Sequence, residues 1–469
     1  MTTALRDAFA RLMADAGMPD AAIRTFLFHF DRYQHGESGL LAGHSIVPLE
    51  ELPDAGALAG HRGSGRRALD RTVVVKLNGG LGTSMGLERA KSLLEVRDGL
   101  SFLDLICRQV LALRRRLGAR VPLLFMNSFR TDADTREVVE RYPDLAHDEI
   151  PHGFLQHQVP KVLADTLAPA GTVVEGELGW CPPGHGDLYT ALATTGLLER
   201  MIAAGFEYAF VSNADNLGAL PDPDLLGFMV DQRIDLLVEA ADRTAADRKG
   251  GHLCRLADGR LALRESAQCP PDELDDFQDV HRHRYFNTNN LWLHLPSLRR
   301  LLDEHRGVLP LPTIVNRKHL DPRDPSSPEV AQLETAMGAA VAVFPRAAAV
   351  RVPRTRFSPV KTTSDLLAVR SDAYELGDDG SVTLIRERER PPTIELDPSW
   401  YRLIDDFERR FPAGPPSLRA CDSLTVEGDV TFGDRVAVSG TAVIVSQGRA
   451  TVPDGALVEG RYEPQAAVR

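Results

Sequence analysis

The feature that most constrains this chain is the stretch VVVKLNGGLGTSMGLERAK, residues 73–91. Its three valines are typical of a buried strand, and glycines follow at 79, 80, 82 and 86. Glycine lacks a Cβ and permits positive φ, so backbone N–H groups in such a loop can close around a phosphate or a flat ring. A strand leading into a glycine loop is the usual site geometry at the carboxyl edge of an open α/β sheet. An ordinary flexible turn is the alternative interpretation.

The loop differs from two common phosphate-binding motifs. A P-loop has the form GxxxxGK[ST]. No pair of glycines here is five positions apart and followed by lysine and then serine or threonine. The dinucleotide fingerprint GxGxxG would need a glycine at position 85, where this chain has methionine. The chemistry of the loop therefore has to be identified from the rest of the chain.

Length and composition narrow the class of protein. A chain of 469 residues exceeds one ordinary core, so two or three domains are expected. The net charge of −12 argues against a general nucleic-acid partner. The most apolar stretch, residues 338–350, is too short to span a bilayer, and the five cysteines form no CxxC pair. We expect a reduced cytoplasmic enzyme without a membrane partner.

The order of patterns along the chain predicts an α/β core. Residues 1–70 are interpreted as an accessory region with one early helix, and residues 38–67 as a loop or linker. After the glycine loop, apolar spacing over residues 102–117 predicts a helix that ends at Gly118. Residues 121–126 then resemble a second buried strand. Strand, loop, helix and strand make a βαβ unit with parallel strands.

Several polar segments follow predicted strands or loops. The segment WCPPGHGD, residues 180–187, precedes a helical pattern over 188–204, where Asp187 is placed to cap the helix. A strand at 208–211 leads into SNADN, in which Asp215 is placed to hold Mg²⁺ or, alternatively, to form a turn. The asparagines of FNTNNLW suit sugar hydroxyls. Lys361 lies in a polar, proline-braced segment, with an ordinary surface lysine as the alternative.

The tail has a different period. Two apolar series recur every six residues, at Leu424, Val430, Val436 and Ala442 and at Val426, Phe432, Val438 and Ile444. Interleaved series of this kind indicate short parallel β-helix coils, with a plain β-meander as the alternative. No chemical motif falls in this region, so we expect it to pack or oligomerise.

In order along the chain, the segments KLNGGLGTSMG, PPGHGD, SNADN, KGG, FNTNNLW, QLETAMGAA and PVKTTSDLL resemble the eukaryotic-type UTP–glucose-1-phosphate uridylyltransferase family. The resemblance runs from about residue 73 to 458. It implies an α/β fold with a Rossmann-like mixed-sheet catalytic domain, a small helical N-terminal region and a C-terminal left-handed parallel β-helix. The corresponding domains are residues 1–70, 71–380 and 381–469.

The same resemblance assigns roles to individual residues. Those implied to bind the nucleotide are Leu77, Gly79, Gly80, Gln156 and Gly184. Lys91 and Lys361 would bind phosphates, and Asp215 would hold Mg²⁺. Those implied to bind the sugar phosphate are His185, Asn213, Gly251, Asn289 and Glu334.

Three positions depart from the pattern of the family. Ala90 stands where proline is frequent, Gln158 where arginine is frequent, and Cys181 where tyrosine is frequent. We interpret Cys181 as a packed, inert thiol rather than one that sensitises the site to oxidation.

The resemblance implies that UTP and glucose 1-phosphate react reversibly to give UDP-glucose and pyrophosphate. The sugar phosphate would attack the α-phosphorus of UTP in line, and as an anion it needs no general base. The alternatives are the same chemistry on galactose 1-phosphate or N-acetylglucosamine 1-phosphate, and a non-catalytic nucleotide-sugar sensor. A homo-oligomer through the β-helix is also expected.

Overall fold

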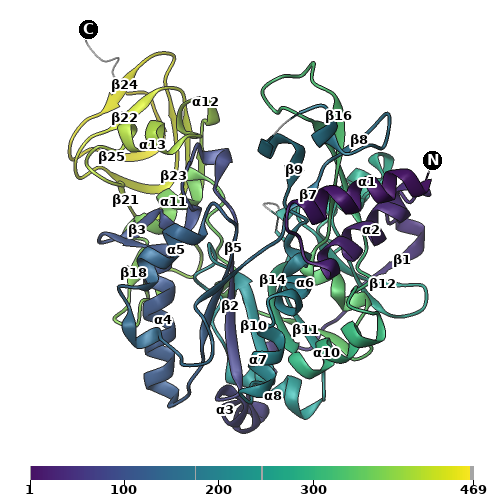
Figure 1. The fold of residues 1–469 in the computed structure, drawn as a ribbon. Helices are drawn as coiled ribbons and strands as arrows, with labels where there is room; N and C mark the ends of the chain where they lie inside the picture. Colours follow the sequence, from purple (N-terminus) through teal and green to yellow (C-terminus); the bar gives the residue numbers. More distant parts are fainter. Residues whose placement is uncertain (1, 175, 245–246, 465–469) are drawn as a thin grey trace.

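A computed structural model describes residues 2–174, 176–244 and 247–464. Its centre is a mixed sheet in the order β1-β12-β14-β10-β2-β5-β6, to which β11, β13 and β17 are added (Figure 1). The strands of this sheet are β1 (Ile46–Pro48), β2 (Thr72–Asn78), β5 (Leu123–Asn127), β6 (Gly153–Leu155), β10 (Tyr208–Asn213), β11 (Leu236–Asp242), β12 (His252–Leu256), β13 (Leu261–Arg264), β14 (Tyr285–His294) and β17 (Ala347–Arg351). The predicted mixed α/β architecture is confirmed.

Helices cover both faces of this sheet (Figure 1), as the burial of the apolar side chains of β2 on both faces requires. Side chains alternate between the faces of a strand, so Val74 joins one core while Val73 and Val75 join the other. The first core receives helices α3 (Arg62–Leu69), α4 (Phe102–Leu117) and α8 (Pro223–Asp231). The second receives α6 (Leu188–Thr194), α7 (Leu197–Ala203) and α10 (Leu295–Glu304). The valine run is therefore buried on both sides.

The predicted βαβ unit is confirmed. Strand β2 pairs in parallel with β5, and α4 crosses between them. A reciprocal capping box of Ser101 and Asp104 starts α4, and Gly118 ends it in the left-handed conformation with φ 63°. The expected helix over 188–204 is instead two helices, because Gly196 adopts φ 69° and interrupts the chain between α6 and α7.

The N-terminal residues are more ordered than expected. Helices α1 (Thr2–Asp15) and α2 (Asp20–Gln34) pack together through Phe9, Phe26 and Phe30. The prediction that residues 38–67 are a linker is wrong in two places: β1 pairs with β12, and α3 begins at Arg62. The glycines of α3 serve helix packing, since a Cβ on Gly65 would lie 1.7 Å from the carbonyl oxygen of Pro223 in α8.

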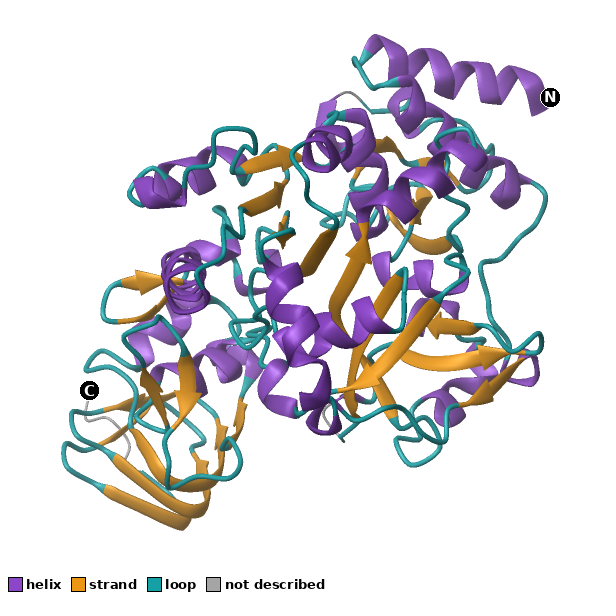
Figure 2. Cartoon of the chain, turned by 90° about the horizontal axis from the view of Figure 1, so that it is seen from below, coloured by secondary structure: helices purple, strands orange, loops and turns teal. Residues whose placement is uncertain are grey.

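The C-terminal strands form a separate, mainly parallel array at one end of the molecule (Figure 2). It consists of β20 (Thr393–Leu396), β21 (Ser417–Glu427), β22 (Val430–Phe432), β23 (Ala437–Val445), β24 (Ala450–Val452) and β25 (Leu457–Tyr462). Leu424 pairs with Ala442, and Val426 pairs with Ile444, so one coil spans three repeats of the predicted period. Both predicted apolar series are buried throughout.

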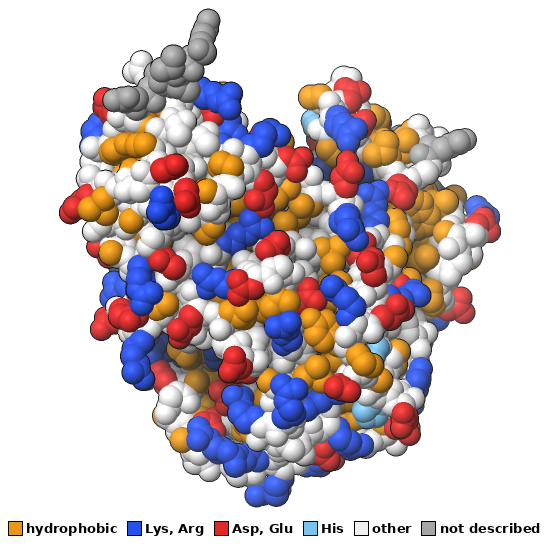
Figure 3. Space-filling model, turned by 90° about the vertical axis from the view of Figure 1, so that its left-hand side faces the viewer, with side chains coloured by type: hydrophobic (Ala, Val, Ile, Leu, Met, Phe, Trp, Pro, Cys, Tyr) orange, Lys and Arg blue, Asp and Glu red, His pale blue; other side chains and the backbone are white. Residues whose placement is uncertain are grey.

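Around this array lie the short helices α11 (Thr363–Arg370), α12 (Pro398–Tyr401) and α13 (Ile404–Arg410). On the face drawn in Figure 3, acidic and basic side chains are interspersed without a broad basic surface. Within the described ranges, no helix combines the length and the apolar character needed to cross a bilayer.

Candidate active site

A pocket of about 330 Å³ opens where β2 and β10 end side by side. The two strands are parallel and place Leu77 opposite Asn213, so the glycine loop and the SNADN turn leave the same edge of the sheet. Nine of the residues expected at the site line this pocket, namely Leu77, Gly79, Gly80, Lys91, Gln156, Gly184, His185, Asn213 and Asp215. Met126 and Ser92 also line it, although no sequence motif marked them.

The glycine loop is shaped by two close approaches. A Cβ on Gly79 would lie 2.8 Å from Nε2 of Gln156, so the glycine leaves room for that amide against the loop. Gly82 has φ 66°, and the N–H of Lys91 donates to the carbonyl of Gly80 at 3.2 Å. The loop thus folds back on itself, so that the backbone of Lys91 lies next to Gly80 near the start of the loop.

Lys91 and Asp215 form an ion pair inside the pocket. The Nζ of Lys91 lies 2.7 Å from Oδ2 of Asp215, and the two side chains are only 16% and 19% exposed. A cation from the glycine loop and a carboxylate from the neighbouring strand therefore face the same small volume. Ions that are shielded from solvent in this way interact more strongly than ions on an open surface.

The carboxylate of Asp215 is a suitable ligand for Mg²⁺, which prefers oxygen. Among the described residues, no cluster of three or more His, Cys, Asp or Glu side chains could hold a metal ion by itself. Mg²⁺ commonly binds through one or two carboxylates, with substrate phosphates and water completing its coordination. Asp215 is the one carboxylate among the described lining residues of the pocket, which fits that mode of binding.

His185 is held in a neutral form. Its Nδ1 accepts a hydrogen bond from the N–H of Met337 at 3.0 Å, and burial lowers the pKa of His185 to about 4. An accepting Nδ1 leaves the proton on Nε2, so the ring presents one donor. Gly184 has φ 79°, and a Cβ there would meet the carbonyl oxygen of Thr335 at 2.4 Å, which explains the glycine.

The predicted capping role of Asp187 is wrong. Its carboxylate does not bond the first turn of α6. It accepts instead from the backbone N–H of His157 at 2.7 Å and pairs with the ring Nδ1 of His157 at 2.8 Å. Because His157 follows Gln156, the carboxylate braces the segment that carries the pocket glutamine.

Four of the expected residues lie outside this pocket. Glu334 ends β16 (Glu329–Glu334), and its Cβ would be 3.1 Å from a Cβ on Gly184. Gly251 and Asn289 are linked through Asn287, which donates its backbone N–H to the Gly251 carbonyl at 3.0 Å and its amide to Asn289 at 2.9 Å.

Lys361 is the fourth residue outside the pocket. Its side chain is exposed, but the segment before it is fixed, because the N–H of Val360 donates to the carbonyl of Asp215 at 3.2 Å. The backbone of the second lysine is thus tied to the turn that carries the pocket carboxylate.

Glu265 lies beside the predicted sugar-phosphate residue Gly251, and the sequence did not single it out. A Cβ on Gly251 would lie 2.5 Å from its Oε2. Burial raises the pKa of Glu265, and the nearby charges of Lys361 and hydrogen bonding to Asn287 oppose this rise. The surrounding sequence, LALRES, has no recognisable motif, so only proximity in the fold identifies this carboxyl group.

The three departures from the family pattern have distinct surroundings. The N–H of Ala90 donates to Oδ2 of Asp134 at 3.1 Å, a bond that proline could not make. Cys181 is buried beneath the N-terminal helices, and burial raises its pKa to about 12, as expected for an inert thiol. Gln158 lines a neighbouring cavity of about 220 Å³ that also touches Gly79.

Residues 24–439 match the model of the UTP–glucose-1-phosphate uridylyltransferase family. A UTP–glucose-1-phosphate uridylyltransferase of Hordeum vulgare is 40% identical over an alignment of 474 positions that covers 97% of this chain and 95% of the relative. One of Solanum tuberosum is 41% identical over 421 residues, covering 89% and 85% of the two chains.

Solved structures agree with this match. A mutant UDP-glucose pyrophosphorylase from Leishmania major in complex with UDP-glucose is 42% identical, with a TM-score of 0.91 over 98% of this chain and 99% of that chain. UDP-glucose phosphorylase from Trypanosoma brucei is 41% identical, with a TM-score of 0.90 over 98% of this chain and 100% of that chain. The chain therefore belongs to the UTP–glucose-1-phosphate uridylyltransferase family.

Proposed function

We propose that the pocket beneath the glycine loop is the site at which this uridylyltransferase joins UTP and glucose 1-phosphate, releasing UDP-glucose and pyrophosphate. The observation that carries the proposal is the convergence of Lys91 and Asp215 within 2.7 Å, at the edge of a sheet that also presents the glycine loop. A cation and a metal-binding carboxylate are the groups that a reaction between two polyanions needs.

The uridine would lie along the glycine loop, against Leu77, Gly79 and Gly80. The amide of Gln156 offers both a donor and an acceptor, so it can pair with the edge of uracil. Its placement against Gly79, where a Cβ would lie 2.8 Å away, supports this role. Gly184 would allow the nucleotide to approach the backbone closely.

The sugar phosphate would be bound on the other side of the pocket. Neutral His185 can donate from Nε2, and Asn213 offers an amide. The sugar hydroxyls would reach Gly251, Asn289 and Glu334, and we add Glu265 because it touches the space beside Gly251. Carboxylate and amide groups together suit a ring with several hydroxyls.

The chemical step requires no general base, because the attacking phosphate oxygen is already an anion. The side chains would position the two substrates in line and offset the charge that develops on the bridging and leaving oxygens. Lys91 would act on the triphosphate and Lys361 where the two phosphates meet. Mg²⁺ held by Asp215 would supply further charge neutralisation at the phosphates.

The experiment that tests this function is a measurement of pyrophosphate release and nucleotide-sugar formation. UTP is offered with glucose, galactose and N-acetylglucosamine 1-phosphates, with and without a chelator, and ATP and GTP replace UTP in parallel. We expect the highest kcat/KM for UTP with glucose 1-phosphate and loss of activity with the chelator. Binding of UDP-glucose without any turnover would identify the sensor alternative instead.

For the C-terminal region we propose a left-handed β-helix that mediates self-association. The parallel pairing of β21 with β23 and of β22 with β24 supports a coil, and Leu457 is 66% exposed on its last strand. Size-exclusion chromatography with light scattering should detect an oligomer that Leu457→Asp weakens. The domain boundaries near residues 70 and 380, and the cytoplasmic location, stay predictions from the sequence.

A further inference from the structure

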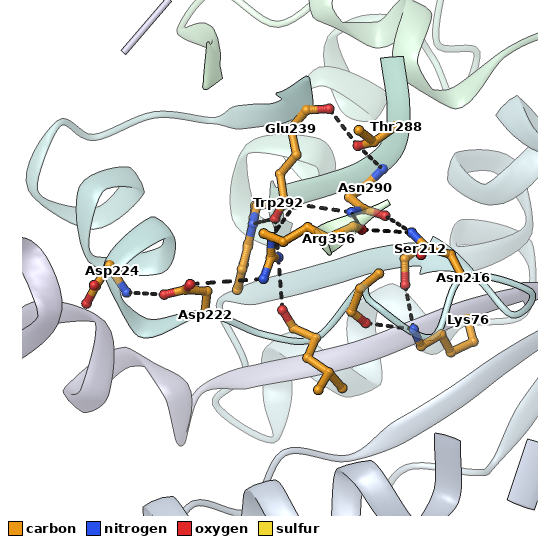
Figure 4. Close-up of polar contacts among 12 residues, drawn as sticks. Lys76, Ser212, Asn216, Asp222, Asp224, Glu239, Thr288, Asn290, Trp292 and Arg356 are labelled. Atoms are coloured by element: carbon orange, nitrogen blue, oxygen red, sulfur yellow. Dashed lines mark hydrogen bonds and ion pairs between the residues drawn. The ribbon is translucent and has the colours of Figure 1, made fainter. Parts of the chain in front are cut away.

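Glu239 and Arg356 form a buried ion pair that is hydrogen-bonded to Asn216, the residue after Asp215 (Figure 4). Glu239 of β11 has no exposed side-chain surface, and the side chain of Arg356 is 12% exposed. Arg356 donates to both carboxylate oxygens, from Nε at 2.8 Å and from Nη2 at 2.6 Å. The indole N–H of Trp292 and the amide of Asn290 complete the surroundings of Glu239, at 2.9 and 3.1 Å. The carboxylate is therefore fully hydrogen-bonded within the protein.

Arg356 connects this buried carboxylate to the turn that contains Asp215. Its Nη2 also donates to the carbonyl of Leu220 at 2.9 Å, just beyond the turn. Its own backbone carbonyl accepts from the amides of Asn216 and Asn290, both at 3.1 Å. The guanidinium and the backbone carbonyl of Arg356 therefore bond to Glu239 and to residues beside the Asp215 turn.

From Arg356 the chain runs along the same turn to Lys361. The N–H of Ser358 donates to Oδ1 of Asn216 at 3.0 Å, and the N–H of Val360 donates to the carbonyl of Asp215 at 3.2 Å. These two bonds join the segment before Lys361 to the Asp215 turn, and the bond from the Asn216 amide to the Arg356 carbonyl connects both to the buried pair.

A buried lysine also supports the turn from inside. Lys76 of β2 donates from Nζ to Oγ of Ser212 at 2.8 Å and to the carbonyl of Ala219 at 2.9 Å (Figure 4). These two residues lie on either side of Asp215. The turn is therefore held at both of its ends, and Arg356 links it to the lysine segment.

A contribution to stability alone is a poor explanation for the buried ion pair of Glu239 and Arg356. Removing two ions from water is costly, and an apolar pair of similar size is often as stable or more stable. A bidentate guanidinium, however, fixes distance and orientation in a way that apolar contacts do not. The contribution of the pair is therefore the fixed distance and orientation of the segments that it joins, rather than added stability.

We infer that Glu239 and Arg356 are positioning residues, which act through the Asn216 contacts to hold Lys361 at a fixed separation from Asp215. The inference rests on the proposed roles of Lys361 and Asp215 in phosphoryl transfer. Displacement of a catalytic group by about 1 Å can lower turnover by up to roughly 100-fold. The pair would thus affect turnover without touching substrate.

The test is a double-mutant cycle between Glu239→Gln and Lys361→Ala, measured as kcat and KM for UTP and for glucose 1-phosphate. We expect Glu239→Gln to lower kcat by about 10- to 100-fold while KM for UTP stays nearly constant. In the Lys361→Ala background the same change should cost less than about threefold, because the group being positioned is already gone.

Asp235→Asn is the matched control. Asp235 precedes the same strand and is bound bidentately by Arg346 at 3.1 and 2.8 Å, and within the described ranges neither side chain is hydrogen-bonded or ion-paired to the Asp215 turn or the Lys361 segment. Its effect on kcat should be small and equal in both backgrounds. Additive effects of Glu239→Gln and Lys361→Ala on kcat would overturn the inference.

A second variant separates positioning from folding. Glu239→Gln alone leaves the Arg356 charge with only Asp222, at 4.0 Å, as an ionic partner, and the loss of its bidentate carboxylate can prevent folding. Glu239→Gln/Arg356→Met removes both charges and should recover a thermal melt close to that of the wild type, while kcat remains low. A folded double variant with wild-type kcat would equally refute the positioning role. If the wild type forms no nucleotide sugar, the proposed function fails instead.

Discussion

Replacement of Lys91 by methionine tests the centre of the proposed site. The ammonium lies 2.7 Å from Asp215 and is only 16% exposed, so solvent screens it little. Removal of one preorganised electrostatic group from an active site costs roughly 10²–10³-fold in kcat, or about 2.7–4 kcal/mol of transition-state stabilisation. We expect a loss of that size for Lys91→Met, together with weaker UTP binding because the residue follows the nucleotide loop.

The same change should also lower stability. Without the ammonium, the shielded carboxylate of Asp215 has lost a charged hydrogen-bond partner, which typically costs about 1–3 kcal/mol. Adding Asp215→Asn to Lys91→Met should restore part of the melting temperature, since an amide needs no cation. The double variant should remain inactive.

The assay is continuous detection of pyrophosphate at saturating and limiting UTP, with a thermal melt of every variant. Lys318→Met is the control, because Lys318 is an exposed lysine whose ammonium bonds only to Oε1 of Gln332 among the described residues, at 3.0 Å. Its turnover should match that of the wild type. A folded Lys91→Met enzyme with kcat within about threefold of the wild type would refute the electrostatic reasoning.

The remaining predictions concern the metal, the base, the tail and pH. Asp215→Asn should lose most turnover and require more Mg²⁺, because an amide is a poorer ligand than a carboxylate; a normal rate at limiting Mg²⁺ would exclude Asp215 as the ligand. Gln156→Ala should narrow the preference for UTP over ATP and GTP more than it slows the reaction with UTP, and an unchanged preference would contradict the uracil assignment. A chain that ends at Pro416 should melt at a lower temperature yet keep the kcat of its folded fraction, since no proposed catalytic residue lies beyond that point; an inactive but fully folded truncation would disprove this. Burial lowers the pKa of His185 to about 4 from 6.5, so between these pH values the unfolded chain binds a proton that the folded state does not, and the free energy of unfolding falls as pH decreases. His185→Gln should make the melting temperature less sensitive to acid, and an identical pH slope in both proteins would show that His185 does not titrate in this way.

The order of elements could be predicted wherever a local pattern has one physical interpretation. The valine run, the apolar spacing of α4 and the glycine at its end describe backbone preferences within a few turns of chain, and the structure confirms each of them. The period of six in the tail was equally informative, because it identifies which side chains face inward regardless of how far the coils are from the rest of the protein. Seven ordered motifs were sufficient to identify the family.

Local patterns were misleading where one type of residue can have more than one structural role. The glycines near residue 65 resemble a linker, yet they let α3 approach α8 closely. Asp187 stands where a capping residue would, yet its carboxylate is used by His157, thirty positions earlier. In both cases a residue far away in the sequence decides the role, and the spacing of neighbouring residues does not identify that partner.

Local patterns and ordered motifs were therefore enough to predict the fold class, the family and most of the residues that meet in the pocket. Only the tertiary structure identified Glu265 and the pair of Glu239 with Arg356, which are 117 positions apart in the chain. Isolated charged residues in a sequence look the same whether they are solvated or buried. Their burial and pairing follow from how the strands are arranged in the sheet, and that arrangement brings the two halves of the proposed active site together.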